Sequence, residues 1–185
     1  MQQSKIFIPS LGDPPSWKLV VYSDASHANL SDGVSSMGAH IVFLVGTGNR
    51  CCPLSWTANK IKRVVRSTIA AEALSLLEGI EDAIFLRTLI EELFQFSSGT
   101  IPVDAVVDNK SVVEAIYSTR MVEDKRLRID ISAIKQFTES DVRSIQWCPG
   151  TMQLANSLAK RGAQTKQILD TFQSGSLLME SWKFQ

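Results

Sequence analysis

Three carboxylates lie inside or at the end of apolar segments, and they constrain the fold of this 185-residue chain more than any other feature. Asp24 ends the strand-like run that begins at Leu19, and Asp108 ends the run that begins at Val103. Glu72 lies within a helix-like apolar run. A carboxylate in such surroundings is costly unless it is paired or bound to a cation. One shared divalent metal site would explain all three.

Each carboxylate also has a purely structural explanation. Asp24 could begin a turn after its strand, because Asp is common in turns. Glu72 flanks a buried stripe at helical spacing, so its stem could pack while its head reaches water. Asp108 could cap the following helix, since Asp is a favoured N-cap. That last role does not exclude metal binding, because ligand sites in such sheets gather at the C-terminal ends of strands.

The hydrophobic pattern predicts strands and helices in the order β-β-β-α-β-α-α-β-α. Strands are expected at residues 17–23, 34–45, 50–57, 101–107 and 142–148, with a turn-rich segment at 29–33. Helices are expected at residues 64–94, 109–117, 126–138 and 152–161. This order predicts an α/β fold with a mixed five-stranded sheet, in which three antiparallel strands are followed by parallel additions, flanked by helices.

Length and composition fit one globular domain, with a leader at residues 1–16, a core at 17–162 and a C-terminal extension at 163–185. The 19 basic and 19 acidic residues balance, so net charge alone does not indicate a nucleic-acid partner. The chain has no secretory signal and no long apolar stretch, and its three cysteines favour a reducing compartment. We therefore expect a cytoplasmic protein without a membrane partner.

Four segments, in this order, resemble the ribonuclease H domain of copia-type retrotransposon polyproteins, within the ribonuclease H-like superfamily. They are residues 22–25 (YSDA), 66–73 (RSTIAAEA), 107–111 (VDNKS) and 153–162 (QLANSLAKRG). Each is weak by itself, but four in the right order are specific, and the likeness spans most of the chain. The chain departs from the family pattern at Asn156, where that pattern carries Asp.

The resemblance implies that Asp24, Glu72, Asp108 and Asn156 are the catalytic and metal-binding positions. Two Mg²⁺ ions are expected there, with Mn²⁺ as a substitute, because two ions can activate a water and relieve charge on the leaving oxygen of a phosphodiester. Asn156 offers a neutral oxygen, so it should hold the second ion weakly. It is either an introduced substitution that permits binding without cutting or natural drift. We favour the first, because the surrounding residues are intact.

A second group of residues is expected to hold nucleic acid, through basic side chains, helix-capping hydroxyls and backbone amides. Its members are Ala25, Ser26, His27, Lys62, Arg63, Arg66, Ser67, Thr68, Asn109 and Lys160. The roles of Ala25, Ser26 and His27, as backbone donors to the 2′-hydroxyls of RNA, rest on the resemblance. The basic run before Ser67 has an equally simple explanation as a solvated turn.

These expectations describe an endonuclease that hydrolyses the RNA strand of RNA/DNA hybrids during retroelement reverse transcription. Its partners would be the hybrid and the reverse transcriptase polymerase domain of the parent polyprotein, in a cytoplasmic retroelement particle. Two alternatives stay open: an inactive ribonuclease H-like domain that binds nucleic acid, and one that only supports a neighbouring polymerase. The three intact carboxylates argue against a purely supporting role. Asn156 is the residue that distinguishes the active endonuclease from the inactive nucleic-acid-binding domain.

Overall fold

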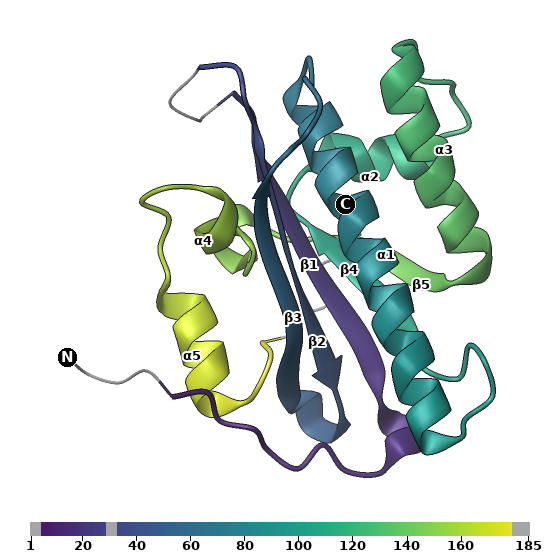
Figure 1. The fold of residues 1–185 in the computed structure, drawn as a ribbon, viewed down its shortest axis with the longest axis vertical. Helices are drawn as coiled ribbons and strands as arrows, with labels where there is room; N and C mark the ends of the chain where they lie inside the picture. Colours follow the sequence, from purple (N-terminus) through teal and green to yellow (C-terminus); the bar gives the residue numbers. More distant parts are fainter. Residues whose placement is uncertain (1–4, 29–32, 179–185) are drawn as a thin grey trace.

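One five-stranded sheet organises the molecule, in the strand order β3-β2-β1-β4-β5 (Figure 1). The computed structural model describes residues 5–28 and 33–178. The strands are β1 (Lys18–Ser26), β2 (Met37–Val45), β3 (Cys51–Lys60), β4 (Val103–Val107) and β5 (Val142–Trp147). β1, β2 and β3 pair antiparallel, whereas β4 pairs parallel with both β1 and β5. The predicted mixed five-stranded sheet is confirmed.

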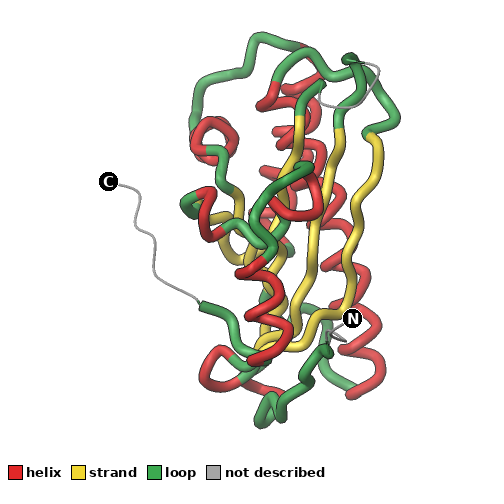
Figure 2. Tube along the Cα trace, turned by 90° about the vertical axis from the view of Figure 1, so that its left-hand side faces the viewer, coloured by secondary structure: helices red, strands yellow, loops and turns green. Residues whose placement is uncertain are grey.

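Helices cover both faces of the sheet. Three of them lie on one face: α1 (Thr68–Phe94), α2 (Lys110–Tyr117) and α3 (Lys125–Ser140). Two shorter helices, α4 (Asn156–Ala159) and α5 (Lys166–Ser174), lie on the other face. Figure 2 shows the strands from the side of these two short helices. None of the described helices is both long and apolar enough to cross a membrane.

β1 supplies both hydrophobic cores, because successive side chains of a strand point to opposite faces. Leu19 and Val21 belong to the core on the side of α1, where Leu76 and Ile80 of that helix also lie. Val20 and Tyr22 belong to the second core, which includes Ile168 of α5. All of these β1 residues are buried. The central strand is therefore apolar on both sides up to Tyr22, two residues before the first carboxylate.

Two predicted helices differ from the observed ones by more than two residues at one end. α1 begins at Thr68 rather than at residue 64, because the Ser67 hydroxyl caps it by accepting a hydrogen bond from the Ala70 N–H at 3.3 Å. The last predicted helix, 152–161, is shortened to α4 because Gly150–Met152 forms a separate 3₁₀ turn and Lys160 has extended backbone. The turn predicted at 29–33 falls largely on residues 29–32, which are outside the described residues.

The described parts of the leader and the extension pack on one end of the domain. The Phe7 N–H donates to the Phe172 carbonyl at 2.7 Å, and the Thr47 N–H donates to the Leu11 carbonyl at 3.0 Å. α5 lies within the predicted extension, and Leu177 beyond it is also buried. Both segments therefore contact the body of the domain, and the boundaries at residues 17 and 162 remain predictions.

Ser75 fastens α1 to the two central antiparallel strands. Its buried hydroxyl accepts a hydrogen bond from the Ala39 N–H at 3.1 Å. The same oxygen lies 2.9 Å from the Asp24 carbonyl and 3.0 Å from the Ala39 carbonyl, to which it can donate its single proton. One side chain thus fixes the position of α1 relative to β1 at the residue that carries the first carboxylate.

Replacing Ser75 with Ala should lower the free energy of unfolding by about 1–3 kcal/mol, because buried backbone groups lose their partner. Urea unfolding followed by circular dichroism measures this change. Ser174→Ala is the matched control, since this exposed hydroxyl makes only local contacts, at 3.5 Å with the Thr171 and Ser176 carbonyls and at 3.3 Å with the Ser176 N–H. It should change stability by less than about 0.5 kcal/mol. Equal effects of the two substitutions would show that Ser75 does not clamp α1.

Candidate metal centre

Two neighbouring parallel strands deliver Asp24 and Asp108 to the same end of the sheet. The pairing of β1 with β4 ends at Tyr22 and Val106, and each carboxylate lies two residues beyond that last pair. α1 brings Glu72 to the same place, about one helical turn before Ser75. One oxygen from each of the three carboxylates lies within 4.8 Å of the others. The three predicted ligands are therefore brought together.

The structural alternatives for these carboxylates are wrong. Asp24 begins no turn: it is fully buried within β1, which continues to Ser26. Glu72 does not reach water, because it is only 3% exposed. Asp108 is not the helix cap, since Asn109 takes that role and accepts a hydrogen bond from the Val112 N–H at 3.2 Å. None of the three is explained by local structure.

Several oxygens of this cluster have no hydrogen-bond partner. Among the residues that the structure describes, the buried atoms without a partner include Asp24 Oδ2, Glu72 Oε2 and Asn156 Oδ1. Buried acceptors are nearly always satisfied in native proteins, and each unsatisfied one needs an explanation. Carboxylate and amide oxygens are the hard ligands that Mg²⁺ prefers. The donor set and its unpartnered oxygens therefore fit a divalent metal ion.

Lys160 also reaches the cluster. Its Nζ donates to Asp24 Oδ1 at 2.8 Å, from the residue that ends α4. The sequence predicted that Lys160 contacts nucleic acid, but no pattern in the sequence indicated that its ammonium would lie on a candidate metal ligand. The contact was missed because it joins residues that are 136 positions apart in the sequence.

Asn156 is the first residue of α4 and is linked to Asp108 through Gly150. Its Nδ2 donates to the Gly150 carbonyl at 3.4 Å. Gly150 in turn is next to Asp108, because a Cβ added at Gly150 would lie 3.3 Å from Asp108 Oδ2. The structure thus places Asn156 in the loop and helix that border Asp108.

Gln153 is a buried residue of this region that the sequence analysis did not single out. Its Nε2 lies 3.0 Å from the Ser23 carbonyl and 3.3 Å from the Val106 carbonyl, and donates to both. These carbonyls belong to β1 and β4 just where the pairing of the two strands stops. Gln153 therefore holds together the two strand ends that carry Asp24 and Asp108. In the sequence it stands out only as the first residue of the segment 153–162.

Burial and mutual repulsion change the acidity of the cluster. Burial raises the pKa of Glu72 to about 9, and the charges of Asp24 and Asp108 add to the rise. Burial also raises the pKa of Asp24 to about 6, although the hydrogen bond and charge of Lys160 act in the opposite direction. In the metal-free protein, Glu72 therefore retains a proton at neutral pH, which a bound cation would displace.

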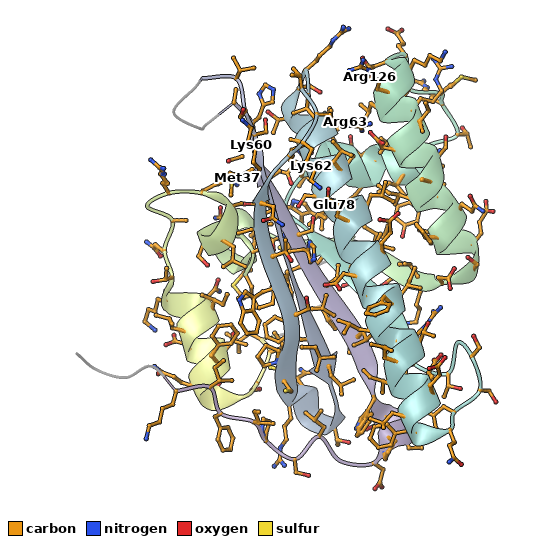
Figure 3. All side chains as sticks on the ribbon, in the orientation of Figure 1. Met37, Lys60, Lys62, Arg63, Glu78 and Arg126 are labelled. Atoms are coloured by element: carbon orange, nitrogen blue, oxygen red, sulfur yellow. The ribbon has the colours of Figure 1, made fainter. Side chains whose placement is uncertain are left out.

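The predicted nucleic-acid contacts divide into three groups. Ala25 and Ser26 are buried beside the cluster within β1, and the half-buried His27 ring lies 3.3 Å from the Val65 carbonyl. Lys62, Arg63 and Arg66 are exposed near the start of α1, where Figure 3 labels the first two. The remaining residues lie at helix N-termini. Ser67 caps α1 and Thr68 is its first residue, while Asn109 caps α2.

The basic run formed by Lys62, Arg63 and Arg66 is only partly available to bind nucleic acid. Arg63 forms an ion pair with the buried carboxylate of Asp130 in α3. Lys62 and Arg66 remain exposed on either side of it. A cavity of about 270 Å³ lies between this run and α3, lined by Arg66, Ser67 and Arg126 among others. The solvated-turn explanation therefore fails for Arg63, which supports α3, and stays open for its neighbours.

Several solved structures are similar to this protein over most of its chain. The N-terminal RNase H domain of a Mycobacterium tuberculosis protein, solved as a fusion with maltose binding protein, is 20% identical with a TM-score of 0.57, covering 86% of this chain and 98% of that chain. RNase H1 from Halobacterium salinarum is 18% identical with a TM-score of 0.51, covering 77% and 94%. No family model matches the sequence, and no curated protein does either.

The chain has the ribonuclease H-like fold. The strand order, the mixed pairing and the flanking helices agree with those neighbours. A foamy viral protease-reverse transcriptase, solved in complex with an RNA/DNA hybrid, is also similar, with 16% identity and a TM-score of 0.55. The match covers 83% of this chain but only 21% of that one. At these identities the likeness establishes the ribonuclease H-like fold and nothing finer.

The raised pKa of Glu72 predicts how stability depends on pH. Between the usual value of 4.5 and about 9, the folded protein keeps a proton that the unfolded chain releases. Metal-free protein should therefore lose stability as pH rises through that window. Glu72→Gln removes this loss, so it should stabilise the protein more at pH 8 than at pH 5, with a difference above about 1 kcal/mol.

Urea unfolding in EDTA at the two pH values measures the difference. Glu78→Gln, an exposed substitution on the same helix (Figure 3), is the control and should show no such dependence. If Glu72→Gln and Glu78→Gln behave alike at both pH values, the Glu72 carboxyl is not confined in a repulsive cluster.

Proposed function

We propose that this chain is a metal-dependent endoribonuclease that hydrolyses the RNA strand of RNA/DNA hybrids. The observation that carries the proposal is the convergence of three carboxylates at one end of the sheet, two of which, Asp24 and Glu72, have a buried oxygen without a hydrogen-bond partner. The neighbours of the same fold are ribonuclease H domains. One of the similar chains was solved with an RNA/DNA hybrid bound, which supports the hybrid as the substrate class.

Asp24, Glu72 and Asp108 would hold the metal, with Asn156 as a fourth ligand. We propose two Mg²⁺ ions, for which Mn²⁺ can substitute. Such ions supply an activated water and stabilise the leaving oxygen of a phosphodiester. The three carboxylates confine and orient the cations, and Gln153 keeps the two strand ends in place. Asn156 contributes an oxygen without charge, so the second ion would be held weakly and cleavage would be slow.

Groups around the centre would grip the substrate. Arg66 lines the cavity between the start of α1 and α3, and Lys62 is exposed in the same basic run, so their charges can attract phosphates. Ser67, Thr68 and Asn109 place hydroxyl, amide or backbone groups at helix N-termini, which favour phosphate oxygens. The backbone near Ala25, Ser26 and His27 borders the carboxylates, which is where contacts to a 2′-hydroxyl would select RNA.

The biological setting follows from the same resemblance. We propose that the chain is part of a copia-type retrotransposon polyprotein, next to a reverse transcriptase polymerase domain and active in a cytoplasmic particle. The foamy viral match supports this setting, because there a segment of this fold occupies about a fifth of a longer protease-reverse transcriptase chain.

A second candidate function is hybrid binding without cleavage. Two observations favour it: Asn156 replaces a carboxylate of the family pattern, and Lys160 already neutralises part of the charge of Asp24. A domain with this centre could bind the hybrid through its basic groups and cut it poorly. Restoring the carboxylate distinguishes the two functions.

Asn156→Asp should raise the rate of RNA-strand hydrolysis at least tenfold, which corresponds to about 1.4 kcal/mol of activation barrier. The added charge compensates a second divalent ion where an amide cannot. A labelled RNA/DNA hybrid in limiting Mg²⁺ measures the rate, and Mn²⁺ should partly rescue the Asn form. Asp108→Asn in the Asn156→Asp background should abolish the gain.

Equal rates for the Asn and Asp forms in limiting Mg²⁺ would show that position 156 is not a metal ligand. If neither form cuts the hybrid but both bind it, the binding function replaces the proposed one. Thermal unfolding of each variant confirms that a change in rate does not reflect a loss of folded protein.

A further inference from the structure

Lys160 forms an ion pair with a fully buried carboxylate. Its Nζ is 2.8 Å from Asp24 Oδ1, while the Lys160 side chain is 35% exposed and the Asp24 side chain is not exposed at all. An ion pair with one partner fully buried interacts more strongly than a pair of two exposed groups. The ammonium is thus held at the carboxylate cluster, although part of the Lys160 side chain is exposed.

The pair occupies only one side of the cluster. Lys160 satisfies Oδ1 of Asp24, whereas Oδ2 of Asp24 and Oε2 of Glu72 have no partner. The place for a cation and the place of the ammonium are therefore different oxygens of the same aspartate. A divalent ion and Lys160 can bind Asp24 together.

The charges of the site then favour one divalent ion. Asp24, Glu72 and Asp108 contribute three negative charges when ionised, and Lys160 contributes one positive charge. The ionised site therefore has a net charge of minus two, which one divalent cation neutralises. Asn156 adds no charge to this total. A second divalent ion would leave the buried site positively charged, which low dielectric surroundings oppose.

Asn156 and Lys160 act through the same helical turn. The Lys160 N–H donates to the Asn156 carbonyl at 3.0 Å and closes that turn, while Lys160 itself follows α4 in extended backbone. Asn156 carries no charge, so it does not compete with Asp24 for the ammonium.

We propose that the Lys160 ammonium is a built-in counter-cation that takes the charge-neutralising place of a second divalent ion, so that the centre binds one divalent ion tightly. This inference rests on the proposed metal centre and deepens it. It assigns Lys160 a positioning role on the metal ligands in addition to any contact with nucleic acid. Its consequence is that removing Lys160 strengthens metal binding, whereas losing a merely structural contact would weaken it.

Mn²⁺ binding to the whole chain without nucleic acid tests the proposal. The probe is Mn²⁺ itself, measured by isothermal titration calorimetry and by the electron paramagnetic resonance signal of the free ion. The wild-type chain should bind one Mn²⁺ tightly. Lys160→Met should lower the Kd of that ion at least about tenfold, because the local repulsion between ammonium and metal disappears.

Lys166→Met is the matched control. It removes the same charge from an exposed ion pair with Asp170, in α5, and should change the Kd by less than about twofold. The proposal is overturned if Lys160→Met binds Mn²⁺ no more tightly than Lys166→Met does, or if the wild-type chain binds two Mn²⁺ ions with comparable affinity.

Lys160→Gln is a second variant that separates the effect of charge from the loss of the hydrogen bond, because an amide can still donate to Asp24 but carries no charge. It should also bind Mn²⁺ more tightly than the wild-type chain. In EDTA both variants should melt below wild type, because a buried carboxylate has lost its counter-charge. Added Mn²⁺ should raise their melting temperatures more than that of wild type. An equal rise in all three proteins contradicts the proposal.

The proposed function and this inference can fail separately. If the wild-type chain cuts the hybrid while Lys160→Met binds Mn²⁺ no more tightly, only the inference fails. If Lys160→Met binds Mn²⁺ more tightly but no form cuts the hybrid, the nuclease function fails and the counter-cation remains. If neither protein binds Mn²⁺, the centre is not a metal site and the inference is overturned with it.

Discussion

Repulsion within a cluster of three carboxyl groups, two of them buried, is the constraint on which this structure depends. Their oxygens lie within 4.8 Å of one another, and two of the three residues are almost completely buried. Such a cluster is unfavourable without positive charge, and within the described residues only Lys160 forms an ion pair with it. The sheet, the clamp at Ser75 and the bridge at Gln153 hold the carboxylates in place despite this repulsion. Packing energy from both hydrophobic cores therefore maintains a site that is poised for a cation.

The fold was predictable because its signals are local. Alternating and continuous apolar runs located all five strands, and the strand and helix order specified a mixed sheet. The boundaries were less accurate where capping decides them. The helical pattern continues upstream of Ser67, so the cap alone sets the start of α1 at Thr68. The C-terminal segment was left undefined because one turn of apolar residues around Ile168 does not distinguish a helix from a loop that packs on the body.

The candidate site was predictable in part. Asp24, Glu72 and Asp108 could be found because each interrupts an apolar segment, and a charge in that position needs a reason. Lys160 and Gln153 could not be found in the same way, since their partners are Asp24, Ser23 and Val106, which are distant in sequence. Arg63 has a partner that the sequence did not indicate. Its place in a basic run predicts phosphate binding, and in the folded protein it also pairs with Asp130.

The most direct test of the account is to locate a divalent ion in crystals of the wild-type chain grown with Mn²⁺, using the anomalous scattering of manganese. The account predicts one strong peak within about 2.5 Å of oxygens from Asp24, Glu72 and Asp108, with Lys160 still bonded to the other oxygen of Asp24. No anomalous peak at the cluster under saturating Mn²⁺ would contradict the claim that these carboxylates form a metal centre.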